Sequence, residues 1–309
     1  MKSALSRSSL VTVVAACAAL ALPGCATASV DTGGSGSTAT VQVVAAENFW
    51  GDIAAQLGGS HVTVTSLISN PNADPHLFET DARDAATLAR ARVIVENGAG
   101  YDTWMGSLLS ADSGAPTVVD AATVLHVTGP DPNPHLWYDI GRVPVVAAAI
   151  AAALSKADRR DAAAFHANLV RFDATLRPLD ATLADIRQRF DHAPVAYTER
   201  VPGYALSAAG LDVLTPSGFA RAIEDGSDPG PADSLAMQKL ITTHAIDVLL
   251  YNVQTVTPVT SQIRALAVQH HIPVVGVSET MPSDVSSFQQ WQQNQLRALF
   301  GALVKSHGA

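Results

Sequence analysis

Hydrophobic and polar positions follow two alternating patterns from residue 41 onward. Short, continuous Val- and Ile-rich runs are typical of strands buried on both faces of a parallel sheet. The segments between them place apolar residues at the spacing of amphipathic helices. The pattern predicts an α/β fold with two lobes, each with a four-stranded, mostly parallel sheet and flanking helices. The expected strands are 41–46, 62–68, 92–96 and 117–121 in the first lobe, and 194–198, 211–215, 247–252 and 273–278 in the second.

One long segment between the two groups of strands, 158–190, has helical spacing almost throughout. A helix of this length would span roughly 50 Å, so it is expected to join a lobe of residues 41–157 to a lobe of residues 191–309 as a rigid rod. Pro178 lies inside the segment and would either kink one helix or separate two shorter ones. A rod between the lobes would restrict hinge closure.

The N-terminus has the features of a secretory signal at residues 1–24. A positively charged start precedes an apolar run that is too short to span a bilayer and ends in "LPGC". This ending resembles a bacterial lipobox, in which Cys25 is acylated and anchors the mature chain to the membrane; ordinary cleavage near 26–28 is the alternative. The Gly/Ser/Thr-rich residues 25–40 would form a flexible tether. Cys17 is lost with the signal, so no disulfide is expected.

The net charge of the chain limits the kinds of ligand that it can bind. The net charge is −9, and it becomes −11 without the first 24 residues, which carry two positive charges and no acids. An acidic chain without a basic cluster is a poor candidate for binding nucleic acid or anionic lipid, and its field suits a cationic ligand. About 270 folded residues are enough for two lobes, each with its own core.

Two loops present a histidine in nearly the same context: "PNADPHLFE" (71–79) contains His76, and "PNPHLWYD" (132–139) contains His135. Both loops follow strands of the first lobe, and ligands of α/β sheets gather beyond the carboxyl ends of strands. The proline before each histidine stiffens the approach. The leucine and aromatic residue after it are expected to plug into the lobe. We therefore expect both imidazoles to face one site.

The second lobe places a carboxylate after each of two strands, Glu199 in "AYTER" and Glu279 in "GVSETMP". Two neutral imidazoles and two carboxylates would bind a divalent cation with no net residual charge, which eases its burial in a cleft between the lobes. Without the metal, facing carboxylates would repel each other or take up a proton.

These residues lie in motifs that resemble the metal-binding lipoproteins of ABC importers, the cluster A-I family of zinc- and manganese-binding proteins. The resemblance covers 41–309, and its motifs are "NPNADPHLFE", "ENGAGYDTWM", "NPHLWYD", "YTERVPGYALSAAGL", "YNVQTVTPVT" and "VVGVSETMP". It implies a monomeric, extracytoplasmic, lipid-anchored bacterial binding protein, not an enzyme, that hands metal to a permease and its ATPase. The family's four metal ligands fall on His76, His135, Glu199 and Glu279.

The chain departs from zinc-binding relatives at three places. Glu199 stands where they often have His, the loop 126–134 contains a single His instead of a His/Asp-rich run, and the fourth ligand is commonly Asp instead of Glu279. Asp284 is an alternative fourth ligand. Monodentate carboxylates would suit tetrahedral Zn²⁺, whereas bidentate ones would suit Mn²⁺, so the ion stays open between zinc and manganese.

Two other functions compete with metal capture. A metal-dependent hydrolase would need an open coordination position and a general acid or base. A binding protein for an organic solute would need stacking platforms, and aromatic residues make up only 6% of the chain. An adhesin role would be an added surface property. Tyr251 and Asn252 could contact the ligands. The acids at 225 and 228, and the remaining histidines, are expected to be surface or structural residues.

Overall fold

The computed structural model describes residues 40–71, 75–111 and 114–308, which belong to one compact unit. The proposed signal peptide and the lipidation site Cys25 lie outside the described residues, as does the tether up to residue 39. The backbone of His76 is described, but its side chain is not.

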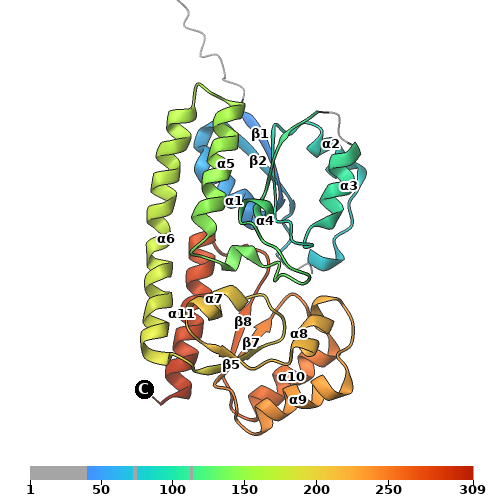
Figure 1. Ribbon diagram of the computed structural model, residues 1–309, viewed down its shortest axis with the longest axis vertical. Helices are drawn as coiled ribbons and strands as arrows, with labels where there is room; N and C mark the ends of the chain where they lie inside the picture. The colour runs from blue at the N-terminus through green and yellow to red at the C-terminus, as the bar shows by residue number, and fades with distance from the viewer. Residues whose placement is uncertain (1–39, 72–74, 112–113, 309) are drawn as a thin grey trace, which may run out of the picture. The chain divides into compact units, whose positions relative to one another are not determined.

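The first lobe is built on a fully parallel sheet with strand order β2-β1-β3-β4 (Figure 1). The predicted apolar runs form these strands because both faces of the sheet are covered by helices. The strands are β1 (Val41–Glu47), β2 (Val62–Ile68), β3 (Val93–Glu96) and β4 (Thr117–Asp120). The helices between them are α1 (Asn48–Gly58), α2 (Ala82–Leu88) and α3 (Thr103–Ala111), and α4 (Ala121–Val124) follows β4.

The second lobe repeats the plan with strand order β6-β5-β7-β8, again fully parallel. Its strands are β5 (Pro194–Tyr197), β6 (Asp212–Val213), β7 (Val248–Asn252) and β8 (Val274–Val277). Its helices are α7 (Gly203–Ala208), α8 (Ser217–Glu224), α9 (Pro231–Thr242), α10 (Pro258–Gln269) and α11 (Phe288–Ser306). The predicted α/β fold with two four-stranded sheets is confirmed.

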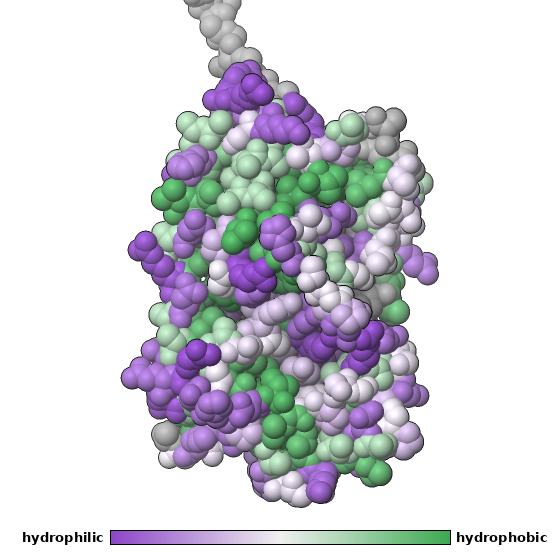
Figure 2. Space-filling view, viewed as in Figure 1, coloured by the Kyte–Doolittle hydropathy of each residue, from purple (hydrophilic) through white to green (hydrophobic). Residues whose placement is uncertain are grey.

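The predicted long helix is α6 (Ala162–Phe190), which follows α5 (Val143–Ala157). It continues through Pro178, so the alternative of two shorter helices is wrong. Figure 1 shows α6 running alongside both lobes, where it packs against α1 and α5 of the first and α11 of the second. Along the left edge of Figure 2, hydrophilic patches alternate with hydrophobic ones. The buried side chains of α6 recur at three, four or seven residues, at Phe165, Phe172, Leu176, Leu179, Leu183, Ile186 and Phe190.

The main hydrophobic core is continuous through both lobes. One cluster joins the inner face of the first sheet, the buried stripe of α6 and the inner face of the second sheet. Only the outer face of each sheet has a smaller cluster of its own. The expectation of a separate core for each lobe was therefore wrong, because α6 and α11 carry apolar side chains that fill the space between the sheets.

No helix among the described residues is both long enough and apolar enough to cross a membrane.

Candidate metal centre

His135 is completely buried at the end of the loop that follows α4. The chain turns at once into a single 3-10 turn, Leu136–Tyr138, whose three side chains are buried. The ring of Trp137 stacks on Phe49 of α1 at 4.1 Å between centroids. The leucine and aromatic residue after this histidine therefore anchor the loop in the first lobe, as the sequence predicts.

The loop of His76 is anchored differently. Its backbone forms the 3-10 turn Pro75–Leu77, but the side chain of Leu77 is 77% exposed. The expectation that Leu77 plugs into the lobe was wrong. Phe78 provides the contact instead, with its ring 4.6 Å from that of Trp104. The two loops thus share a 3-10 turn at or next to the histidine but not the packing of the leucine.

The tautomer of His135 is set by Asn133. The side-chain oxygen Oδ1 of Asn133 lies 2.7 Å from Nδ1 of His135 and also accepts the backbone N–H of His135 at 3.1 Å. An amide oxygen only accepts, so the proton is on Nδ1 and the lone pair is on Nε2. Among the described residues, Nε2 has no hydrogen-bond partner, and Oε2 of Glu279 lies 3.6 Å away. A buried imidazole nitrogen with a free lone pair beside a carboxylate is suited to binding a metal.

The two carboxylates come from equivalent places in the second sheet. Glu199 and Glu279 each lie two residues beyond the end of their strand, β5 and β8, and both are buried. Asn252 ends β7, which lies between those two strands. Its amide therefore reaches both acids: Nδ2 donates to Oε2 of Glu199 and, at 2.7 Å, to Oε1 of Glu279. A single neutral amide thus holds two carboxylates close together.

The first lobe also contacts Glu279 through Tyr101, whose hydroxyl donates to Oε2 at 2.8 Å. Burial, reinforced by the nearby carboxylate of Glu279, raises the pKa of Tyr101 well above its ordinary value. The phenol therefore keeps its proton and remains a donor. Gln254 holds the backbone of the same acid, because its Oε1 accepts hydrogen bonds from the backbone N–H groups of Glu279 and Thr280.

Arg200, directly after Glu199, ties the His135 loop to the second lobe. Its guanidinium donates to Glu224 at 2.6 Å and 3.0 Å and to Oδ1 of Asp131 at 3.2 Å. Arg221 also pairs with Asp131. The backbone oxygen of Arg200 accepts from Nδ2 of Asn133 at 2.9 Å. A cavity of about 260 Å³ lies at this contact, lined by Tyr101 and the charged residues of the network.

The sequence-predicted residues therefore divide into three groups. The structure places His135 beside Glu279, at the contact between the lobes, and the amide of Asn252 links Glu279 to Glu199. Asp284 is exposed and lines a different cavity, beside α11. The imidazole of His76 is outside the described side chains. Among the side chains that are described, no three His, Cys, Asp or Glu residues converge in an arrangement that would hold a metal ion.

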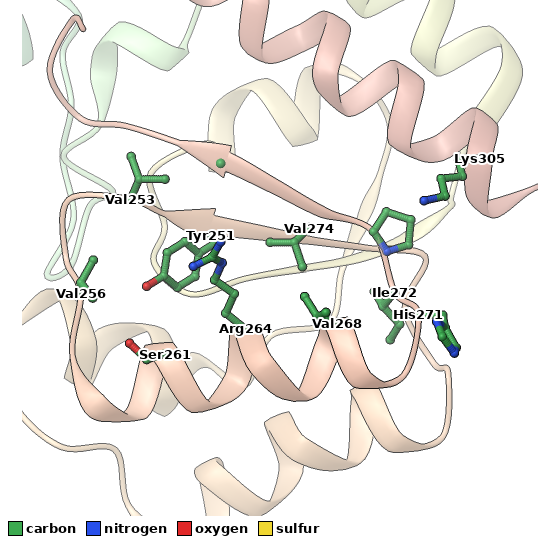
Figure 3. A pocket seen from close by; sticks show the side chains of 12 residues that line it. Tyr251, Val253, Val256, Ser261, Arg264, Val268, His271, Ile272, Val274 and Lys305 are labelled. Carbon is green, nitrogen blue, oxygen red and sulfur yellow. The ribbon is translucent and has the colours of Figure 1, made fainter.

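Of the two residues expected to contact the ligands, Asn252 lies at the site and Tyr251 does not. Asn252 contacts both acids, whereas the ring of Tyr251 lines a groove beside α10, with the guanidinium of Arg264 5.4 Å from its centre (Figure 3). Tyr101 and Asn133 are positioning residues that were not predicted from the sequence. "ENGAGYDTWM" and the asparagine two residues before His135 were the available signals.

Comparison with known proteins shows how this fold and site are classed. Among solved structures, the zinc-binding protein TroA of Treponema pallidum superposes with a TM-score of 0.72 at 21% identity, covering 86% of this chain and 99% of that one. FpvC of Pseudomonas aeruginosa, solved in complex with Mn²⁺, superposes with a TM-score of 0.74 at 19% identity, covering 87% of this chain and all of that one. These likenesses establish the two-lobed fold of periplasmic metal-binding proteins.

The family follows from the sequence. Residues 43–302 match the family described as zinc-uptake complex component A, periplasmic, and the chain belongs to this family. It is therefore classed with the binding components of uptake systems and not with enzymes. The manganese-binding lipoprotein MntA of Bacillus subtilis (strain 168) is 30% identical over 170 residues, which cover 53% of this chain and 54% of that protein. The match thus spans about half the length of this curated relative.

Proposed function

We propose that the protein captures one divalent transition-metal ion, zinc or manganese, outside the cytoplasm and delivers it to an ABC permease with its ATPase. The single observation that carries this proposal is the buried pair of His135, from the first lobe, and Glu279, from the second, whose carboxylate Asn252 links to that of Glu199. His76 completes the proposed ligand set on the strength of its sequence context. Membership of the zinc-uptake family supports the same function.

The charge balance of the site favours a cation. Both carboxylates and His135 are buried, and hydrogen bonds from neutral donors, Asn252 to both acids and Tyr101 to Glu279, are the contacts that hold the acids. A divalent ion bound by two carboxylates and two neutral imidazoles is electrically neutral as a group, which lowers the cost of burying it. The oxygen-containing ligand set suits Mn²⁺ as well as Zn²⁺. Relatives of both kinds exist, since TroA is described as zinc-binding and MntA as manganese-binding.

Titration calorimetry of metal-free protein tests the ligand set. His135→Ala and Glu279→Gln should each weaken binding of Zn²⁺ and Mn²⁺ by at least about tenfold, because each removes a direct ligand. Asp284→Asn is the matched control, since Asp284 is an exposed acid five residues further along. If Glu279→Gln kept its metal affinity and Asp284→Asn lost it, the fourth ligand would be Asp284 instead of Glu279. Unchanged affinity in both His135→Ala and Glu279→Gln would refute the proposed function.

Two further parts of the proposal need different experiments. Metal content measured on protein purified from its native host without added metal decides between zinc and manganese, because the intrinsic affinity order favours zinc in vitro whatever the physiological ion. Lipid anchoring at Cys25 predicts that Cys25→Ser releases the protein into the medium. Continued membrane attachment of that variant would reject the anchor.

A further inference from the structure

A group of histidines lies at the other end of the second sheet, where β7 and β8 begin. The neighbouring helices α9 and α10 both end there. His244 and His271 follow these ends in left-handed backbone conformations, with φ of 52° and 59°, and His270 is the C-cap residue of α10. Two helix ends thus bring three imidazoles to one part of the surface.

The imidazoles of His244 and His270 are the closest pair. Their ring centres are 5.8 Å apart, with 64° between the ring planes. A zinc–nitrogen bond of about 2.1 Å puts each ring centre about 3 Å from the ion, so two rings on one tetrahedral zinc have centres roughly 5 Å apart. Small rotations of these two surface side chains would therefore give both nitrogens access to one ion. Water would fill the remaining positions, since no group of three ligating side chains lies in place among the described residues.

The surrounding charges have opposing effects on a cation. The carboxyl ends of α9 and α10 carry the negative end of the helix dipole, which favours positive charge. Asp247 lines the same cavity, of about 410 Å³, as His244 and His270, and its carboxylate contacts His307 at 3.0 Å. Lys305 also lines this cavity and opposes a cation; Figure 3 shows its side chain on α11, at the end of the groove where His271 follows α10. The carboxylate of Asp247 and the two helix ends attract a cation, whereas the ammonium of Lys305 repels it, so we expect weak binding.

We propose that His244 and His270 form a second, exposed metal site with low affinity for a nitrogen-preferring divalent ion such as Zn²⁺. The site is separate from the proposed cargo site. Glu199 and Glu279 lie beyond the carboxyl ends of β5 and β8, whereas His244 and His270 lie at the amino ends of β7 and β8. A five-residue strand such as β7 is about 16 Å long, so one ion cannot contact both sites. Imidazole ligands without carboxylates select zinc over manganese.

Equilibrium dialysis against ZnCl₂ alone, with bound zinc measured by elemental analysis, tests this proposal. The protein is the full mature chain carrying Cys25→Ser, to avoid the lipid, and His135→Ala, to disable the cargo site. This background should still bind about one zinc ion weakly. Adding His244→Gln and His270→Gln should weaken that binding about tenfold or more. Adding His126→Gln and His166→Gln is the matched control, since both histidines are exposed elsewhere, and it should change nothing.

Three outcomes would overturn the proposal: no zinc binding in the background, no effect of the His244/His270 pair, or an equal loss in the control pair, which would show an adventitious ion only. Far-ultraviolet circular dichroism confirms that each variant is folded. Failure of the proposed function would give a different result from failure of this proposal. The wild type and the His135→Ala protein would then bind zinc with the same affinity.

Discussion

Replacing Asn133 by alanine tests whether the orientation of His135 determines metal affinity. The substitution removes the acceptor that lies 2.7 Å from Nδ1 of His135 and the donor that lies 2.9 Å from the backbone oxygen of Arg200. Without the acceptor, the proton is no longer fixed on Nδ1, and the ring can turn away from Glu279. Losing such a partner of a ligating histidine typically weakens metal binding about 10- to 100-fold, or about 1.4 to 2.7 kcal/mol.

The assay is the Kd for Zn²⁺ and Mn²⁺ from calorimetry with a competing chelator at pH 7.5. Asn168→Ala is the control, because it removes one hydrogen bond to a backbone oxygen, Leu57 O at 2.7 Å, away from the site. Asn133→Asp keeps an oxygen facing Nδ1 and should retain most of the affinity. Unchanged affinity in Asn133→Ala, while His135→Ala loses it, would refute the role of Asn133. Equal losses in the Ala and Asp variants would assign the effect to the Arg200 contact instead.

Three other predictions concern neighbouring charges. Asp131→Asn should speed metal release about three- to fivefold in a stopped-flow chelator assay. The substitution removes partly exposed ion pairs that hold the His135 loop on the second lobe, and such a pair contributes about 1 kcal/mol or less. A release rate equal to that of Asp225→Asn would contradict this prediction. Burial, then the charge of Asp102, raises the pKa of Glu47 well above its ordinary value, so folding takes up a proton and the wild type loses stability as pH rises above about 4.5. Glu47→Gln should therefore raise the melting temperature by a few degrees at pH 8 and less at pH 4; an equal rise at both would contradict this. Metal affinity should fall as the pH is lowered, because protons compete with the metal for imidazole ligands, and a constant Kd from pH 7.5 to 5 would exclude imidazole ligation.

The fold was predictable because its signals are local. The Val-rich runs of the strands and the apolar stripe of α6 are visible in the sequence, and every predicted strand is present. The shared core was not predictable, since it depends on where α6 and α11 pack. The long helix was predicted from the same spacing, and only the alternative of a break at Pro178 was wrong, because packing on both lobes accompanies a helix that is continuous through the proline.

The site was predictable only in part, for the same reason. A proline–histidine loop and acids after strands are local patterns, so His135, Glu199 and Glu279 could be found. Tyr101 acts across the lobes, on a partner 178 residues away in the sequence, and no local pattern identifies such a partner. Asn133 orients His135 from two residues away, and only its second bond, to Arg200, is distant in the sequence. The exposure of Leu77 shows the converse: two loops with matching sequence need not pack alike.

The contacts between the lobes restrict how the site can open. Tyr101 bonds Glu279, Asn48 exchanges two hydrogen bonds with the backbone of Met281, and Tyr138 donates to the backbone oxygen of Ser278 at 2.7 Å. All three contacts hold the loop that carries Glu279. The hydrophobic core, which is continuous along α6, joins the two lobes as well. Separating the lobes would break these buried or partly buried hydrogen bonds, at about 1 kcal/mol each, and expose apolar surface as well. Moving only the His135 loop would break the partly exposed pairs of Asp131 and three hydrogen bonds, from Asn133 to the backbone oxygen of Arg200, from Tyr204 to that of Asn133 and from Asn97 to that of Pro134. Because this movement leaves the continuous core along α6 covered, we expect metal entry and release to be less costly through the loop than through hinge opening of the lobes.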